Sequence, residues 1–542
     1  EILDALGDSR YQSGRPKYPF AIASRSEAQP GDDDRQTAVL DRSKSIIFSS
    51  PLVFDGMSFG QIAVGIDGNY IRRQLDSILY DNITIFIISV LVAFQVMTAL
   101  FMYSVTGPLE RLNTLINQQA KGNFGKYIVT RGGDSLNKVT LYLSQAAKQL
   151  NERFKVRYEN AGTLPDAALK HLYTIGKRFA LSRTGLPIPL IRSSVGDIRL
   201  PLFIFAFAEE LQKSFLPIFV RQLYEPVYWL NESVVISMPI VAWLTIVGLA
   251  APFSGQFSKR FGSRNIFLIG LIPSALGFLG CSMSQTITQF VLCRSATALG
   301  YAMITISCQE YLLGKHIAGD RNANIAAFVA IVISATMCGT AIGGILAARI
   351  GYQETFQIAA ALMLAAGFTG YQMLSREPGT GIDTRGQKKT GMQGIRILCR
   401  NWRFLLMLLC IVIPTNILMA AYLWYLVPLY LFELGATPAE IARTMMVYYL
   451  LIIIIGEAAS KRVVTLNGLT LLVGLGALLS GIGLVAFHQW THFWAVVFSV
   501  SILGLSHALI KAPQITLSLD LCKAEVASMG HNMVLGALFF LF

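Results

Sequence analysis

Eleven long apolar segments follow Leu200, and they restrict the chain to folds that a lipid bilayer accommodates. About 20 apolar residues in a helix cross roughly 30 Å of hydrocarbon, with every backbone group bonded inside the helix. The chain is 53% hydrophobic and 14% charged, with a mean hydropathy of +0.52, which excludes a soluble globular protein. We therefore expect a mainly α, multi-pass protein of the bacterial inner membrane, in contact with lipid. The segments lie at 201–220, 233–253, 266–284, 286–306, 323–348, 354–374, 402–432, 442–459, 468–487, 492–519 and 526–542.

The longest connection between these segments follows the sixth. It covers residues 375–401 and divides the array into 201–374 and 402–542, six helices and at least five more. The chain begins at Glu1 without a Met and ends at Phe542 inside an apolar segment. We therefore expect a fragment in which the second bundle is truncated.

The basic residues of the loops predict the orientation. Loops after even-numbered segments are rich in Lys and Arg, whereas loops on the other side hold Arg221, Arg349 and Arg443. Because Lys and Arg accumulate in cytoplasmic loops, this asymmetry places the central loop inside the cell. It also accounts for the net charge of +13 without a nucleic-acid partner.

The sequence contains no pattern that predicts an enzyme, a metal site or a cofactor. The seven cysteines begin at Cys281, lie in or beside apolar segments and form no CxxC pair. Cysteines in such positions behave as small core residues. We expect no catalytic residues, no metal and no cofactor.

Two glycine-containing patterns in the array resemble the major facilitator superfamily (MFS). GQFSKRFGSRN follows the second segment, and GEAASKR, from Gly456, occupies the equivalent place in the second half. The fifth segment contains ATMCGTAIGG, which is similar to the glycine-rich motif of that family. Lys259 stands where the family has an acidic residue, so the family's charge relay does not carry over unchanged. The matching positions, with that departure, are Gly255, Lys259, Arg260, Gly262, Arg264, Gly339, Gly343 and Gly344.

The resemblance implies two six-helix bundles around a cavity lined by the first, fourth, seventh and tenth segments. Charged side chains inside a membrane are costly, and they commonly face a cavity or a partner. Glu209 and Lys213 are spaced as an i,i+4 pair, which would leave Glu210 pointing elsewhere. His507 and Lys511 favour an anion, with Glu210 as a proton carrier. The candidates for solute binding or proton coupling are Glu210, Arg294, Asn416, Trp424, Tyr425, His507, Lys511 and Gln514.

Each of these candidates also has a structural interpretation. A polar residue in a span can simply bond neighbouring helices, and Arg294 can be a structural arginine of the fourth helix. The sequence leaves both interpretations open.

Residues 1–80 form a polar region that precedes one further apolar segment. Two β-rich runs flank Phe54-Asp55-Gly56, and a helix from Gly68 to Leu79 is expected to follow them. This order resembles the end of a Cache-like extracytoplasmic sensor, which implies an outside ligand; an unrelated outer α+β domain is the alternative. Residues 81–104 contain the membrane helix, and its uncharged run is 83–103.

The sequence pattern of residues 105–155 predicts two helices separated by a connector. Pro108 is favourable at a helix start, and Leu109, Leu112, Leu115 and Ile116 form a narrow apolar stripe. The pattern resembles a HAMP domain, which implies a parallel homodimer; an amphipathic linker on the bilayer surface is the alternative. A connector, 156–200, leads to the array. The residues that carry the resemblance are Pro108, Leu112, Asp134 and Leu136, with Ser135 in place of the usual glycine.

Two functions fit this organisation. The first is secondary-active transport of a small solute by alternating access, regulated by the outer domain through the HAMP relay. The second is a receptor that controls a C-terminal effector beyond Phe542.

Overall fold

The computed structural model describes residues 2–3, 9–11, 37–40, 45–54, 57–128, 135–160, 165–182, 184–185, 187–189, 195–226, 230–313, 321–374, 400–462, 466–489 and 492–522. Several predicted features lie outside these ranges: most of the central loop 375–401, the last apolar segment 526–542, Asp134 and the turn at Asp55-Gly56. The chain divides into two units, Glu1–Ile87 and Ile88–Phe542, and each is described by itself.

The first unit contains a five-stranded sheet with the order β2-β1-β5-β4-β3. Its centre is the antiparallel pair β4 (Ser45–Phe54) and β5 (Met57–Asp67), which matches the two predicted β-rich runs. β1 (Ile2–Leu3) and β2 (Ser9–Tyr11) extend the sheet beside β5, and β3 (Thr37–Leu40) pairs with β4. Strand β5 ends directly at α1 (Gly68–Phe101).

Helix α1 continues without a loop into α2 (Gly107–Ala120). The two are joined by the π-helical segment η1 (Met102–Thr106), and Pro108 is the second residue of α2. Pro108 therefore lies at the start of α2, as predicted, but no loop separates this helix from the membrane helix. A proline lacks the N–H of a regular helical turn and clashes with the preceding turn, and the π segment provides a wider turn at that point.

The second of the two helices predicted within residues 105–155 is present as α3 (Ser135–Glu159). Its face buried inside the chain consists of Asn137, Thr140, Ser144, Ala147, Asn151 and Phe154, whereas the apolar Val139 and Leu150 are exposed. The following region also folds back: α4 (Asp166–Arg178) follows α3, and β6 (Lys126–Tyr127) pairs with β7 (Ile188–Pro189). The sequence did not predict α4 or this pairing.

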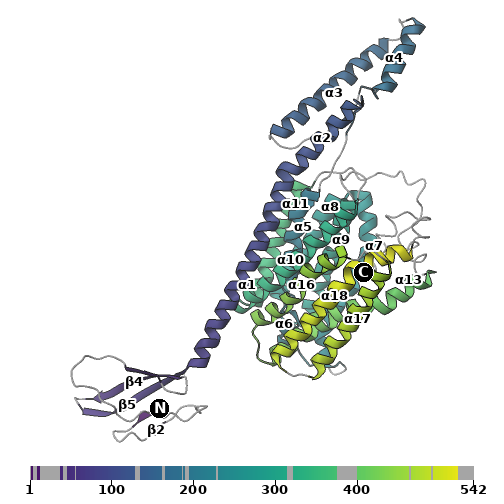
Figure 1. The fold of residues 1–542 in the computed structure, drawn as a ribbon. Helices are drawn as coiled ribbons and strands as arrows, with labels where there is room; N and C mark the ends of the chain where they lie inside the picture. The colour runs from purple at the N-terminus through teal and green to yellow at the C-terminus, as the bar shows by residue number, and fades with distance from the viewer. Residues whose placement is uncertain are drawn as a thin grey trace. The chain divides into compact units, whose positions relative to one another are not determined.

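Helices α5 to α18 form the membrane array, coloured teal to yellow in Figure 1, and they occupy the predicted positions up to residue 521. Within the described residues, nine helices are long and apolar enough to cross a membrane. The first bundle contains α5 (Val195–Glu210), α6 (Leu216–Gln222), α7 (Glu232–Phe261), α8 (Ser263–Met283), α9 (Ile287–Leu313), α10 (Arg321–Arg349) and α11 (Tyr352–Met373). The second contains α13 (Trp402–Met407), α14 (Ile413–Ile417), α15 (Val427–Glu433), α16 (Pro438–Arg462), α17 (Leu466–Gln489) and α18 (Phe493–Leu521).

The seventh predicted segment is one helical run with two π-helical stretches. η3 (Leu408–Val412) separates α13 from α14, and η4 (Leu418–Leu426) separates α14 from α15. Asn416 lies between the two stretches, and Trp424 lies inside the second. π-helical turns inside α-helices are frequently found at functional sites.

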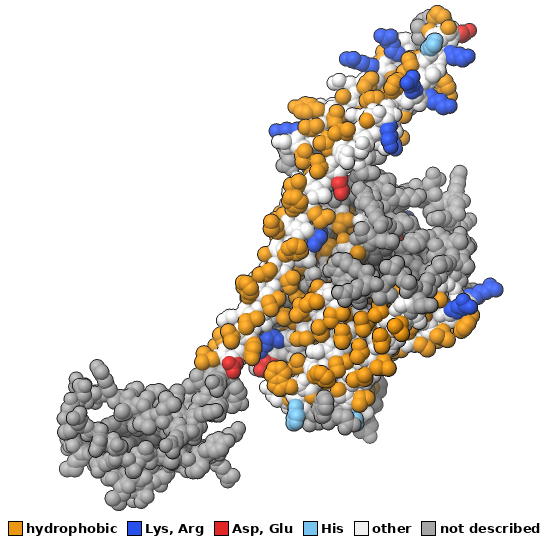
Figure 2. Space-filling view, in the orientation of Figure 1, with side chains coloured by type: hydrophobic (Ala, Val, Ile, Leu, Met, Phe, Trp, Pro, Cys, Tyr) orange, Lys and Arg blue, Asp and Glu red, His pale blue; other side chains and the backbone are white. Residues whose placement is uncertain are grey.

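The outer surface of the array is apolar, as Figure 2 shows over the described helices. Leu249, Leu276, Phe368 and Leu478 are each more than 60% exposed. In water such a surface would be an aggregation site, but in lipid it is the ordinary exterior of a spanning helix. The buried core lies between the helices, around Phe215, Phe219, Phe290 and Phe356.

Candidate functional site

The first apolar segment is interrupted in the middle, which changes the expected ion pair. Helix α5 ends at Glu210, and Leu211–Phe215 form a turn before α6. Across this turn Lys213 Nζ lies 2.7 Å from Glu210 Oε1, and the pair is nearly buried. The expected pairing of Lys213 with Glu209 is therefore wrong, because i,i+4 neighbours face each other only while the helix continues.

Glu209 instead pairs with Arg294 of α9. Arg294 Nη1 donates to Glu209 Oε1 at 2.9 Å and to Thr297 Oγ1 at 2.7 Å, and both members of the ion pair are buried. The guanidinium also lies 5.4 Å from the centre of the Trp243 ring. The structure thus assigns Arg294 a fixed partner within the first bundle.

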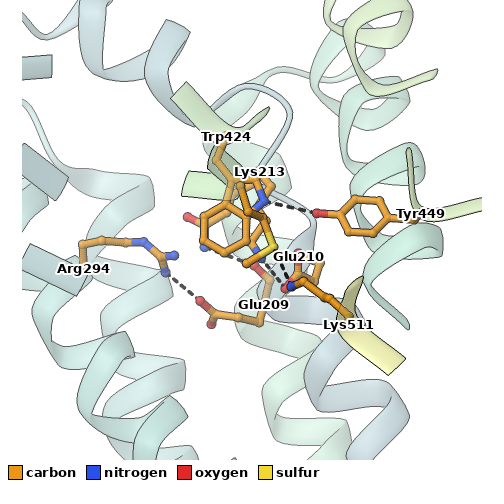
Figure 3. Close-up of polar contacts among 9 residues, drawn as sticks. Glu209, Glu210, Lys213, Arg294, Trp424, Tyr449 and Lys511 are labelled. Carbon is orange, nitrogen blue, oxygen red and sulfur yellow. Dashed lines mark hydrogen bonds and ion pairs between the residues drawn. The ribbon is translucent and has the colours of Figure 1, made fainter. Parts of the chain in front are cut away.

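Lys213 connects the two bundles through an aromatic ring (Figure 3). Its ammonium lies 3.8 Å from the centre of the Trp424 ring, a cation–π distance. Trp424 Nε1 donates to Tyr449 Oη of α16 at 3.2 Å. The chain from Glu210 through Lys213 and Trp424 to Tyr449 therefore runs from α5 into the second bundle.

The polar residues of α18 have different partners. His507 Nδ1 is 2.6 Å from Tyr448 Oη, fully buried, and its Nε2 has no hydrogen-bond partner. Lys511 Nζ is 3.4 Å from Met419 Sδ of η4, and the lysine is partly exposed. Figure 3 draws this contact of Lys511 in the same close-up as Glu210 and Lys213. Of His507 and Lys511, only Lys511 appears in Figure 3 with Glu210 and its neighbours.

The remaining candidates lie in η4, α18 and α14. Tyr425 Oη donates to the Ser233 carbonyl of α7 at 2.8 Å, which joins the bundles near their surface. Gln514 is buried in α18, and Asn416 is partly buried in α14. The sequence did not single out Tyr449, Met419 or Trp243. A tyrosine, a methionine or a tryptophan in an apolar helix is usually a packing residue of the core. The sequence pattern therefore did not indicate that these three residues belong to a polar site.

Most of the glycine and arginine residues of the two motifs lie where helices approach each other closely. Gly262 has φ +86°, and Arg264 Nη2 donates to the Tyr371 carbonyl at 2.7 Å, which fixes the start of α8 against α11. A Cβ on Gly343 would collide with the Leu211 backbone, and one on Gly339 with Phe207 of α5. Gly344 faces Ala442 and Pro438 of α16 in the same way. A Cβ on Gly255 would make only an ordinary van der Waals contact with Ile306. Arg260 is exposed, and its guanidinium lies beside the Phe261 ring.

A second polar cluster lies at the start of α5. Arg111 of α2 forms an ion pair with Asp197 at 3.1 Å, and Tyr311 Oη of α9 donates to the same carboxylate at 3.2 Å. Asp197 is 1% exposed. Deeper along α1, Gln95 accepts from Arg199 at 2.7 Å and donates to Ser334 of α10 at 3.0 Å. The helix that precedes the array is thus bonded to α5 and α10.

Comparison with known proteins gives a family match and several partial relatives. The profile of the Major Facilitator Superfamily matches residues 202–542. The methylenomycin A resistance protein of Bacillus subtilis is 30% identical over 128 residues, 23% of this chain and 27% of that protein. The riboflavin transporter RibZ of Clostridioides difficile is 23% identical over 137 residues, 25% of this chain and 30% of that protein. Each match therefore spans less than a third of the relative's length.

Solved structures match over a longer stretch at low identity. The human organic anion transporter MFSD10 (TETRAN) is 16% identical, with a TM-score of 0.45 over 64% of this chain and 90% of that chain. The xylose transporter XylE of E. coli, in an inward-open conformation, is 13% identical, with a TM-score of 0.46 over 64% of this chain and 90% of that chain.

Proposed function

Because the chain belongs to the Major Facilitator Superfamily, we propose that it carries out secondary-active transport of a small solute by alternating access. The observation that carries the proposal is the polar cluster between the bundles, in which Lys213 of the first bundle pairs with Glu210 and contacts the Trp424 ring of the second bundle. Ionisable groups inside a membrane array commonly mark a solute or ion pathway. Movement of one bundle against the other would break the contact between Lys213 and Trp424. The contacts of Lys213 would therefore differ between the inward-open and outward-open states.

Glu210 has the features of a proton carrier in this cluster. Its Oε1 is bonded to Lys213, whereas its Oε2 is buried without a hydrogen-bond partner. A second oxygen without a donor can accept a proton from a water or from a solute. We assign Glu210 to proton coupling and Lys213 to holding it in place.

Uptake by proteoliposomes tests the transport proposal. The full chain is reconstituted and supplied with a labelled sugar, amino acid, nucleoside, monocarboxylate and amine, with and without an imposed pH gradient. We expect uptake of at least one class, accelerated by the gradient. Glu210→Gln should slow it roughly 30-fold, the effect of about 2 kcal/mol lost from a buried ion pair.

The control for this variant is Glu433→Gln. Glu433 lies 3.0 Å from Arg221, but both side chains are well exposed. An exposed pair contributes at most about 1 kcal/mol, so uptake should stay near the wild-type rate. Failure of all five classes to enter above the level of protein-free liposomes would refute the proposed function.

We also propose that the preceding helices regulate transport. The ion pair from Arg111 to Asp197 is the observation in favour, since it bonds α2 to the first helix of the array. Residues 1–80 would act as the outside sensor and residues 105–155 as a HAMP-like relay. The exposed Val139 and Leu150 of α3 would be covered by the same stripe of a second copy, because an apolar seam in water favours association.

A double-mutant cycle measures this coupling. Arg111→Ala and Asp197→Asn, alone and together, are compared for initial uptake rate. We expect the effects to be non-additive by about 1–3 kcal/mol, or roughly 5- to 150-fold, the usual range for coupled sites. Lys155→Ala with Glu159→Gln, an exposed i,i+4 pair of α3, is the control and should be additive. Additive uptake rates for Arg111 and Asp197 would exclude the regulatory role.

A further inference from the structure

Among the described residues, the charges of the cluster in Figure 3 do not balance. At their ordinary ionisation, Arg294, Lys213 and Lys511 supply three positive charges, and Glu209 and Glu210 supply two negative charges. Arg294 is paired with Glu209, and Lys213 with Glu210. Both carboxylates therefore have a cation of their own before Lys511 is considered.

Lys511 has a weak partner for an ammonium inside a membrane. Its Nζ contacts the thioether of Met419, and the ion pairs among the described residues do not include it. A thioether sulfur is a weak acceptor, whereas an ammonium carries three strong donors. Keeping such a group in an apolar array is costly unless a counter-ion arrives at some stage of the cycle.

The same cluster holds two acceptors without donors. Glu209 Oε2 and Glu210 Oε2 are buried and make no hydrogen bond. Figure 3 draws Lys511 and Glu210 in one group of polar contacts, so a cation with a weak partner and an acceptor without a donor belong to the same cluster. Lys511, Met419 and Trp424 all retain partial exposure, in contrast to the closely packed pair of Glu209 and Arg294.

We propose that the solute is an organic monoanion that also carries a hydroxyl or N–H group. This inference rests on the proposed transport function and specifies its substrate class. The anionic group binds Lys511 and completes the charge balance of the cluster. The donor group binds Glu210 Oε2. A neutral solute would leave the ammonium without a counter-ion, and a cation would add to the excess of positive charge.

Matched probes that differ in charge test the proposal. One triplet is 4-hydroxybenzoate, 4-hydroxybenzamide and tyramine; the other is gluconate, sorbitol and N-methylglucamine. Each triplet keeps size and hydroxyl groups similar while the charge changes from −1 through 0 to +1. We measure the shift in thermal unfolding of the purified full chain, and uptake into proteoliposomes. The anion of at least one triplet should bind and enter, and its two relatives should not.

Lys511→Met and Lys511→Arg identify the residue responsible. Loss of the charge should weaken binding of the anion about 30-fold or more, whereas Arg should retain most of it. Lys511→Met also removes a poorly compensated charge from the array, so its unfolding temperature without ligand should equal or exceed that of wild type. A folded Lys511→Met protein therefore makes the binding result interpretable.

The outcomes separate this inference from transport itself. Equal uptake of the neutral or cationic relatives, unchanged anion binding by Lys511→Met, or uptake of solutes from other classes with none of the anions would overturn the monoanion assignment and leave transport intact. Absence of uptake for every class would instead refute the proposed function.

Discussion

Arg294→Met should destabilise the protein by about 3–5 kcal/mol and reduce uptake to background. The substitution leaves the Glu209 carboxylate buried without its cation, and an uncompensated buried charge is among the most costly single changes. Thermal unfolding in detergent, together with the monodisperse fraction on size exclusion, measures the loss.

Two further variants identify the cause. In the double variant Arg294→Met with Glu209→Gln, most of the stability should return, because neither charge of this ion pair remains to be buried without its partner. Arg221→Met, at the exposed ion pair with Glu433, should change stability by less than about 1 kcal/mol. If the double variant is as unstable as Arg294→Met, the packing of the guanidinium against Trp243 and Thr297, and not the charge, explains the effect.

Gly343→Ala should have the second largest effect, with a loss of about 3 kcal/mol. The added methyl group would overlap the backbone of Leu211, where α10 crosses the turn after α5. Overpacking usually costs 1–3 kcal/mol, and here the obstacle is backbone, which cannot rotate away as a side chain can. Thermal unfolding and uptake should fall together, since separating α10 from α5 displaces Glu210 and Lys213.

The control for this change is Gly481→Ala in α17. A Cβ at Gly481 meets nothing within 4 Å, so the substitution gains up to about 1 kcal/mol from helix propensity. Equal behaviour of the Gly343 and Gly481 variants would show that the close approach of α10 and α5 is not required.

The sequence predicted the helical array because a spanning helix needs a long apolar run, and such runs are visible without an alignment. It also placed the β4 and β5 strands and the two helices α2 and α3. It could not predict the break after Glu210, since Leu211–Phe215 contains no proline or glycine. That break decides which carboxylate Lys213 contacts, so the ion pairing was wrong although the charged residues themselves were singled out.

Long-range partners explain what else the sequence did not reveal. Glu209 meets Arg294 across 85 positions, and Arg111 meets Asp197 across 86. A periodic pattern reports which face of one helix is apolar, but it carries no information on which helix lies opposite. The Trp424 contact with Tyr449 required the same knowledge of neighbouring helices.

The two π-helical stretches, η3 and η4, place more residues in each turn of the seventh segment than a regular α-helix would. A π turn holds about one residue more than an α turn, so converting one to the other shifts the later part of the helix by about one position. One position in an α-helix corresponds to about 100° of rotation. Rotation of the seventh segment about its own axis would therefore move the Trp424 ring away from the Lys213 ammonium, and the bundles would not have to separate first. The contact between the bundles can then be broken in two ways, by rotation of this helix or by movement of one bundle against the other.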